Sequence, residues 1–192
     1  MAEILEFDQY KVTNGHIRFD KNGTLGTAEE LGCTGSLSVE PEIQEVVKMC
    51  EGVEAKRYSK PIRLNGTLVG HIKVAVLRDI FGLTADDLKD GVYGYGSKSV
   101  GGSGALTFDV TDITEETVKY IAFPNVSFTG GLNFSLENGG DEIAQIEIPF
   151  AAHLDKNKKF YYEGFADEIT DEDVKSGWHE NFDEELVKNT TP

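Results

Sequence analysis

Alternation of apolar and polar residues runs through most of the stretch from Gly104 to Asp167, and it constrains the fold more than any other feature of the sequence. Period-two alternation places successive side chains on opposite faces of a β-strand, so that one face can be buried while the other meets water. The alternating runs cover residues 106–111, 118–122, 132–136, 144–152 and 160–166. They predict an antiparallel sheet that is packed on one side, with a turn at residues 138–141 between the third run and the fourth.

The preceding part of the chain predicts one more strand and the principal helix. Residues 68–76 alternate, whereas Leu37 and Val39 alternate only as far as Pro41, which indicates an edge strand or a bend. Residues 43–49 fit a strand or a helix equally well. Thr84-Ala-Asp-Asp87 has the spacing of a capping box, and we expect a core helix over residues 78–90 that ends at Gly91.

The remaining segments are predicted to be an arm, a loop and an extension around a β domain of residues 31–168. Residues 1–30 are interpreted as an N-terminal arm, with a tight turn at Asn14-Gly15. The glycine-rich loop over residues 91–104 is long, and such loops in compact domains are commonly functional. Residues 169–192 form an acidic extension whose short helix starts at Thr170-Asp-Glu-Asp173 and ends at Gly177.

Charge excludes one large class of function. The chain of 192 residues has a formal charge of −16, and residues 163–188 contain ten acidic residues and two lysines. Ordinary nucleic-acid binding needs a basic surface that replaces phosphate counterions, so it is not expected here, although an acidic wall suits nucleic acid that must slide past. No apolar run is long enough to span a membrane, and without the features of a signal peptide we expect synthesis in the cytoplasm.

The sequence shows no pattern of catalytic or metal-binding residues, so we expect neither enzymatic activity nor a cofactor. Gly91 and Gly96 have the spacing of a phosphate-binding loop, but Ser97 stands where its lysine should be. The four histidines are far apart in sequence, and Cys33 and Cys50 are interpreted as small, reduced hydrophobic residues. One binding function stays open, because exposed aromatic residues would suit a carbohydrate-binding β-sandwich: Tyr93, Tyr95, Tyr161, Tyr162 and Trp178.

Four segments together resemble a known family. They are Ala105–Ile113, Ile121–Phe128, Gly131–Ile148 and Lys159–Glu168, with the strand and helix predicted over residues 67–90 in a matching place. In these segments the chain resembles the major tail proteins, which form the tail tube of long-tailed bacteriophages of Gram-positive bacteria. The resemblance covers about residues 32–170 and consists of a scaffold pattern rather than a catalytic signature.

The resemblance implies a mainly β, antiparallel sandwich or barrel-like fold with one flanking helix. Six copies would form a ring, and stacked rings would form the tube of the virion through which DNA passes without specific binding. The implied partners are the chain itself, a tape measure protein in the lumen, a tail terminator and distal tail or baseplate proteins. The related inner-tube protein of a contractile injection system is an alternative with the same fold.

The same resemblance nominates two groups of contact residues. The glycine-rich loop would reach the next ring through Tyr93, Tyr95, Lys98, Ser99 and Val100. The predicted helix would contact a neighbouring subunit through Arg78, Asp79, Phe81, Asp86 and Asp87.

Overall fold

The computed structural model describes residues 4, 6–135, 139 and 143–189, and these residues form a mainly β fold. The elements in chain order are β1 (Lys11–Asp20), β2 (Leu25–Glu30), β3 (Gly32–Cys50), β4 (Val53–Ile72), α1 (Val74–Phe81), β5 (Ser103–Thr111), β6 (Val118–Phe128), β7 (Ile146–Ala152), β8 (Tyr162–Phe165) and α2 (Glu172–Glu180). The predicted mainly β, antiparallel class is confirmed. No helix of the described residues is both long enough and apolar enough to span a membrane.

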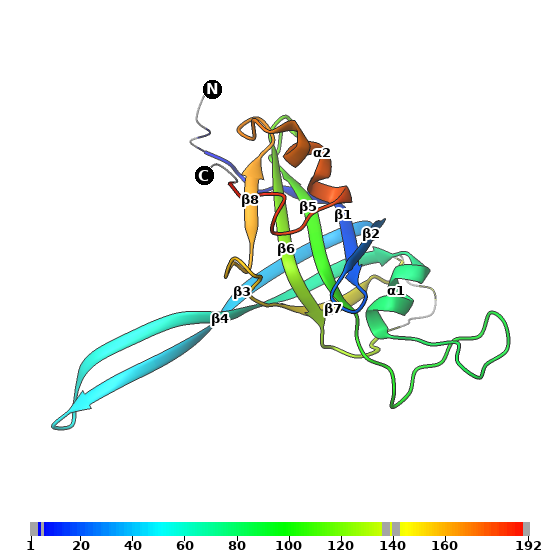
Figure 1. Cartoon of the computed structure of the whole chain (residues 1–192), viewed down its shortest axis with the longest axis horizontal. Coiled ribbons are helices and arrows are strands. Elements are labelled where there is room, and N and C mark those ends of the chain that lie inside the picture. Colours follow the sequence, from blue (N-terminus) through cyan, green and yellow to red (C-terminus); the bar gives the residue numbers. More distant parts are fainter. Residues whose placement is uncertain (1–3, 5, 136–138, 140–142, 190–192) are drawn as a thin grey trace.

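The strands belong to one antiparallel sheet in the order β2-β1-β5-β6-β7-β4-β3, and β8 pairs with the first part of β6. The sheet curls instead of facing a second sheet, so the body has a barrel-like shape (Figure 1). The N–H of Leu31, just before β3, donates to the carbonyl of Gly15 in β1 at 2.8 Å. The two ends of the sheet therefore meet along one side of the body.

The core lies inside this curl because the alternating positions of the strands point there. Ile17 of β1, Phe108 of β5 and Ile148 of β7 are completely buried. Phe123 of β6 packs edge-on against Phe150, with ring centroids 5.6 Å apart. The helix α1 adds Ile80, also completely buried, to the same core.

The predicted helix is displaced toward the N-terminus in the structure. The strand expected over residues 68–76 ends at Ile72, and the helix expected over residues 78–90 spans Val74–Phe81. Gly82 ends it in the left-handed conformation, with φ of 65°, and its N–H donates to the carbonyls of Arg78 and Asp79. Thr84 therefore caps no helix and instead pairs with Gly94 in an isolated bridge.

Two further predictions about strands are wrong. Residues 1–30 are predicted as an arm with some β character, but residues 11–20 form β1 and residues 25–30 form β2, and the buried Ile17 and Phe19 belong to the core. Asn14-Gly15 makes no hairpin turn and lies inside β1, where the pairing with β5 shifts register. The alternating run at 132–136 forms no strand over residues 132–135, where Phe134 is 63% exposed. Leu136 and most of the predicted turn at 138–141 lie outside the described residues.

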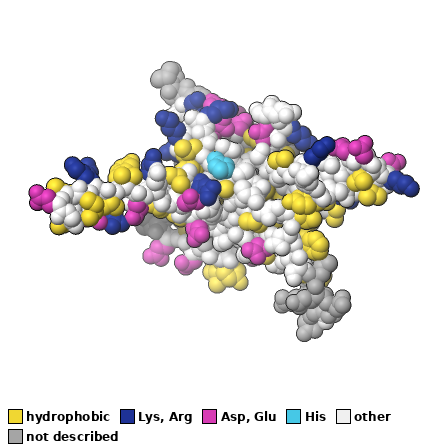
Figure 2. All heavy atoms as spheres, turned by 90° about the horizontal axis from the view of Figure 1, so that it is seen from below, with side chains coloured by type: hydrophobic (Ala, Val, Ile, Leu, Met, Phe, Trp, Pro, Cys, Tyr) yellow, Lys and Arg dark blue, Asp and Glu magenta, His cyan; other side chains and the backbone are white. Residues whose placement is uncertain are grey.

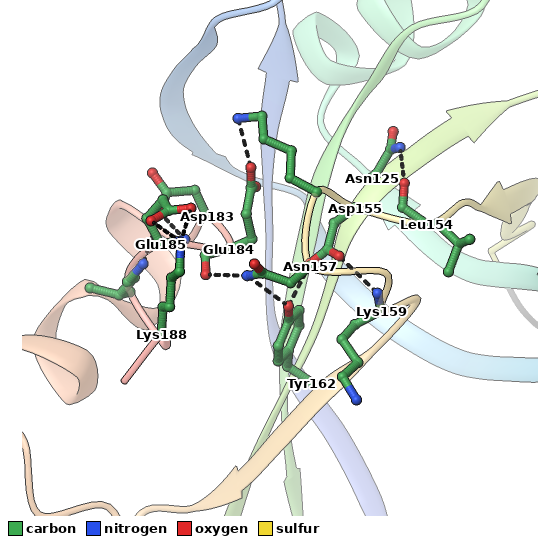
Figure 3. A network of polar contacts seen from close by, with 12 residues as sticks. Asn125, Leu154, Asp155, Asn157, Lys159, Tyr162, Asp183, Glu184, Glu185 and Lys188 are labelled. Atoms are coloured by element: carbon green, nitrogen blue, oxygen red, sulfur yellow. Dashed lines mark hydrogen bonds and ion pairs between the residues drawn. The ribbon is translucent and has the colours of Figure 1, made fainter. Parts of the chain in front are cut away.

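The C-terminal part packs on the body and is not a free extension. The cap of α2 is Asp171, whose carboxylate accepts from the N–H groups of Asp173 and Val174, and the helix continues past Gly177 to Glu180. Trp178 and Phe182 are buried together against Ala122 of β6. Figure 3 shows the contacts that follow: Asn157 donates to the carbonyl of Glu184, and the Tyr162 hydroxyl donates to Asp155.

Candidate assembly surface

The most prominent surface feature is a long hairpin that leaves the body at one end (Figure 1). Strands β3 and β4 pair from Gly32 with Ile72 to Cys50 with Val53. The strand β7 covers β4 only over Leu64–Gly70, so residues 43–62, here called the distal hairpin, pair only with each other. Pro41 lies on β3, the last strand of the sheet, which agrees with the predicted edge position. The ambiguous residues 43–49 are strand.

A tight turn and ion pairs of Arg57 stabilise this hairpin. Glu51 and Gly52 join the strands with φ of 52° and 82°, and two successive positive values match the twist of a tight hairpin turn. The guanidinium of Arg57 binds Glu45 at 2.6 Å and Glu54 at 2.9 Å. At the base, hydrogen bonds from Asn65 and Arg63 hold the pKa of Glu42 below its usual value.

Apolar side chains are exposed all along the distal hairpin. The exposed fraction is 57% for Val46 and 59% for its cross-strand partner Tyr58, and it is 58% for Met49 and 69% for Val53 near the tip. Figure 2 shows these hydrophobic patches among charged side chains on the projecting part of the molecule. A two-stranded hairpin has no core of its own, and exposed apolar patches mark interaction sites. The distal hairpin therefore fits a surface that is covered by another molecule.

The predicted inter-ring loop is a second projection, on the other side of the body from the hairpin (Figure 1). Val100 is 78% exposed and Tyr95 is 48% exposed, and Lys98 is also exposed. Ser99 accepts a hydrogen bond from the N–H of Gly96 at 3.0 Å, so it holds the loop's own turn. Tyr93 lies under the guanidinium of Arg78, 3.7 Å from the ring centroid.

The residues predicted for a helix contact are not on one surface. Arg78 and Asp79 lie on α1, but Phe81 is 6% exposed and belongs to the core, so it is not a contact residue. Asp86 and Asp87 follow the helix in an irregular turn, where Asp87 has a φ of 59°. A 420 Å³ apolar groove, which the sequence did not indicate, runs along α1 and is lined on its other side by Leu132, Phe134, Ala144 and Ile146.

The aromatic surface expected for carbohydrate stacking does not form. Trp178 is 2% exposed, and its indole N–H donates to the carbonyl of Ile121. Tyr161 packs on Phe123 of the core. Tyr162 is half-buried beside Phe182, and burial together with its hydrogen bond to Asp155 raises its pKa to about 12. Only Tyr93 and Tyr95 of this group are exposed.

The tertiary fold brings together two histidines that sequence spacing left apart. His179 of α2 contacts Asp109 through Nε2 at 2.8 Å and Thr107 through Nδ1 at 2.9 Å, and its ring lies 5.2 Å from that of His16. Thr107 is 3% exposed, so its hydroxyl cannot reach a substrate, and the cluster fastens α2 to β5. No group of three or more potential metal-binding side chains occurs within the described residues.

Both cysteines are free thiols, in agreement with the expected reduced state, and both are exposed. Cys33 lies at the start of β3, and Cys50 lies at the tip of the hairpin. Comparison with known proteins adds no assignment, because no family model matches the sequence and no curated protein matches it either.

Proposed function

We propose that this chain is the tail-tube protein of a long-tailed bacteriophage, a structural component of the virion. Copies of it assemble into hexameric rings, and the rings stack into a tube that conducts DNA into the host. Its partners are further copies of the chain, a tape measure protein inside the tube, and the terminator and distal tail proteins at the two ends. The resemblance of the four β segments to major tail proteins is the sequence basis of the proposal.

The observation that carries the proposal is the distal hairpin. Its exposed Val46, Met49, Val53 and Tyr58 lie on an arm that contacts no other strand of the described chain. Ordering the distal hairpin costs conformational entropy, which burial of these side chains against a neighbouring copy would offset. The distal hairpin and the glycine-rich loop project on different sides of the body (Figure 1). This arrangement suits heterologous contacts, in which one surface of a copy binds a different surface of the next copy.

The sheet edges support the same proposal. The strand β2 at one end of the sheet order and β3 at the other each have one neighbour in the sheet, and beyond its start, where the two ends meet, β3 pairs only with β4. Unpaired edges of a β-sheet attract other strands, and a closed ring of copies covers them. The charge of −16 gives a lumen that repels phosphate groups, so that DNA can move without binding.

Electron microscopy of the purified protein, with light scattering over a series of concentrations, tests the proposal. The informative variant replaces Ile43–Ile62 by Asn-Gly, which joins Glu42 to its cross-strand partner Arg63 through a tight turn. We expect rings or tubes from the wild-type chain and monomers from the shortened one. Circular dichroism must show that the shortened chain keeps the β-strand signal expected for the body without the distal hairpin. Tubes formed equally well by the shortened chain would contradict the proposal.

A further inference from the structure

The two faces of the distal hairpin carry different charges. Side chains that are paired across the strands share a face, so Gln44 with Lys60, Val46 with Tyr58, and Lys48 with Lys56 form one face. We call these six residues the basic hairpin face. The opposite face carries Arg57, whose charge is balanced by Glu45 and Glu54.

The basic hairpin face holds three exposed lysines around an apolar centre. Lys48, Lys56 and Lys60 are exposed, and none of them has an ion-pair partner in the described part of the chain. They surround Val46 and Tyr58, both more than half exposed. Three unpaired cations gathered on one face contrast with a chain whose net charge is −16. Such a face fits an acidic protein surface with some apolar character.

A complementary surface exists on the same chain. From Asp167 to Asp173 five of seven residues are acidic and none is basic, and all five carboxylates are exposed. We call residues 167–173 the acidic turn. Its geometry is fixed because the Asp171 side chain caps α2, and Ile169 and Val174 beside it pack into the Trp178 cluster.

The acidic turn and the hairpin cannot meet within one molecule, because α2 lies at one end of the body and the hairpin extends away from it (Figure 1). We propose that the basic hairpin face of one copy docks on the acidic turn of a second copy. The inference rests on the proposed function and names the surface that receives the hairpin. Val46 and Tyr58 are then covered by the partly buried apolar side chains that flank the acidic turn.

Cross-linking with a zero-length carbodiimide, which joins lysines to carboxylates in contact, tests the docking directly. Assemblies are made from a mixture of ¹⁴N- and ¹⁵N-labelled full-length protein, so that links between copies are recognised by mass spectrometry. We expect mixed-isotope links from Lys48, Lys56 or Lys60 to the acidic turn. Links from these lysines only to other carboxylates, or no links between copies, would overturn the inference.

A matched pair of variants gives a second readout. The variant Lys48→Gln, Lys56→Gln, Lys60→Gln and the control Lys21→Gln, Lys89→Gln, Lys159→Gln lose the same charge, and the control lysines are exposed with no ion-pair partner in the described part of the chain. We expect the hairpin variant to raise the protein concentration needed for assembly roughly tenfold or more, as three interfacial charge pairs are lost, and the control to change it by less than about twofold. Equal effects would refute the docking.

The outcomes separate this inference from the proposed function. Tubes that form in the hairpin variant as readily as in the wild-type chain reject the docking and leave the tail-tube proposal standing. Mixed-isotope links to the acidic turn in assemblies that are not tubes support the docking and count against the tail-tube proposal. Retardation of a DNA oligonucleotide by the wild-type chain, lost in the hairpin variant, would show that the lysines bind phosphate and would overturn the docking.

Discussion

Removing the Phe182 side chain measures how firmly the C-terminal part is attached to the body. Phe182 is completely buried, and its ring lies 5.0 Å from that of Trp178 and 5.9 Å from that of Tyr162. Its carbonyl accepts from the guanidinium of Arg18 at 2.8 Å, and this hydrogen bond survives replacement by alanine. The substitution Phe182→Ala therefore isolates the contribution of the aromatic ring.

The expected loss follows from the area that the ring buries. Burying roughly 150 Å² of apolar surface at about 25 cal/mol per Å² stabilises the fold by about 4 kcal/mol. A compact unfolded state reduces this by roughly 10–40%, which leaves about 3 kcal/mol and agrees with the usual range of about 3–5 kcal/mol for this substitution. In a domain of this size, about 3 kcal/mol lowers the melting temperature by roughly 6–12 °C.

Urea unfolding followed by tryptophan fluorescence is the appropriate assay, because Trp178 is the only tryptophan of the chain and lies beside the mutated position. The control is Phe134→Ala, the same chemical change at a side chain that is 63% exposed, and we expect it to cost less than about 1 kcal/mol. A loss below about 1 kcal/mol for Phe182→Ala as well would refute the packed arrangement of the C-terminal part. Residues 169–192 would then be the free acidic extension that the sequence suggested.

Three other expectations can be checked. The pKa of Tyr162 is about 12 in the folded chain and about 10 in the unfolded chain, so its stabilising contribution is complete below pH 10 and is lost as the pH rises to 12. Between pH 10 and pH 12 the melting temperature of the Tyr162→Phe variant should therefore fall less steeply than that of the wild-type chain. The contact of the glycine-rich loop with the next ring is best tested by Val100→Asp, because deleting Ser97–Ser103 would also remove Gly102, whose N–H donates to the carbonyl of Ile80. For Val100→Asp we expect an unchanged melting temperature and fewer tubes in micrographs. Light scattering should show that wild-type assembly increases from about 0.01 M to 0.15 M salt, because the screening length falls from about 30 Å to 8 Å and the repulsion between copies of net charge −16 outweighs the attraction of three lysines for the acidic turn. Assembly that decreases with salt would contradict this balance.

The alternation of residues was enough to predict the strands β5, β6, β7 and β8. Leu106, Phe108 and Val110 of β5 are buried as their positions indicated, because the two-residue repeat of a strand needs no information from elsewhere in the chain. Packing on one side only was a wrong prediction for β5 and β6: Thr107 and Lys119, on the faces expected to meet water, are 3% and 6% exposed, and Ile121, also expected there, lies in the core. The helix α1 was misplaced because residues 74–76 continue an alternating pattern. In the structure these residues are helical, and Val76 and Ile80 of α1 pack into the core.

What the sequence by itself determined is the class of the fold, its antiparallel strands and the acidity of its surface, since these follow from local periodicity and from composition. Only the tertiary structure decided which side chains remain exposed. The sequence around Val46 and Tyr58 does not distinguish them from buried strand residues. They are exposed because β7 pairs with β4 no further than Leu64. Trp178 and Phe182 looked like parts of a solvated tail until they met Ala122. Burial depends on contacts between distant segments, and no local pattern contains that information.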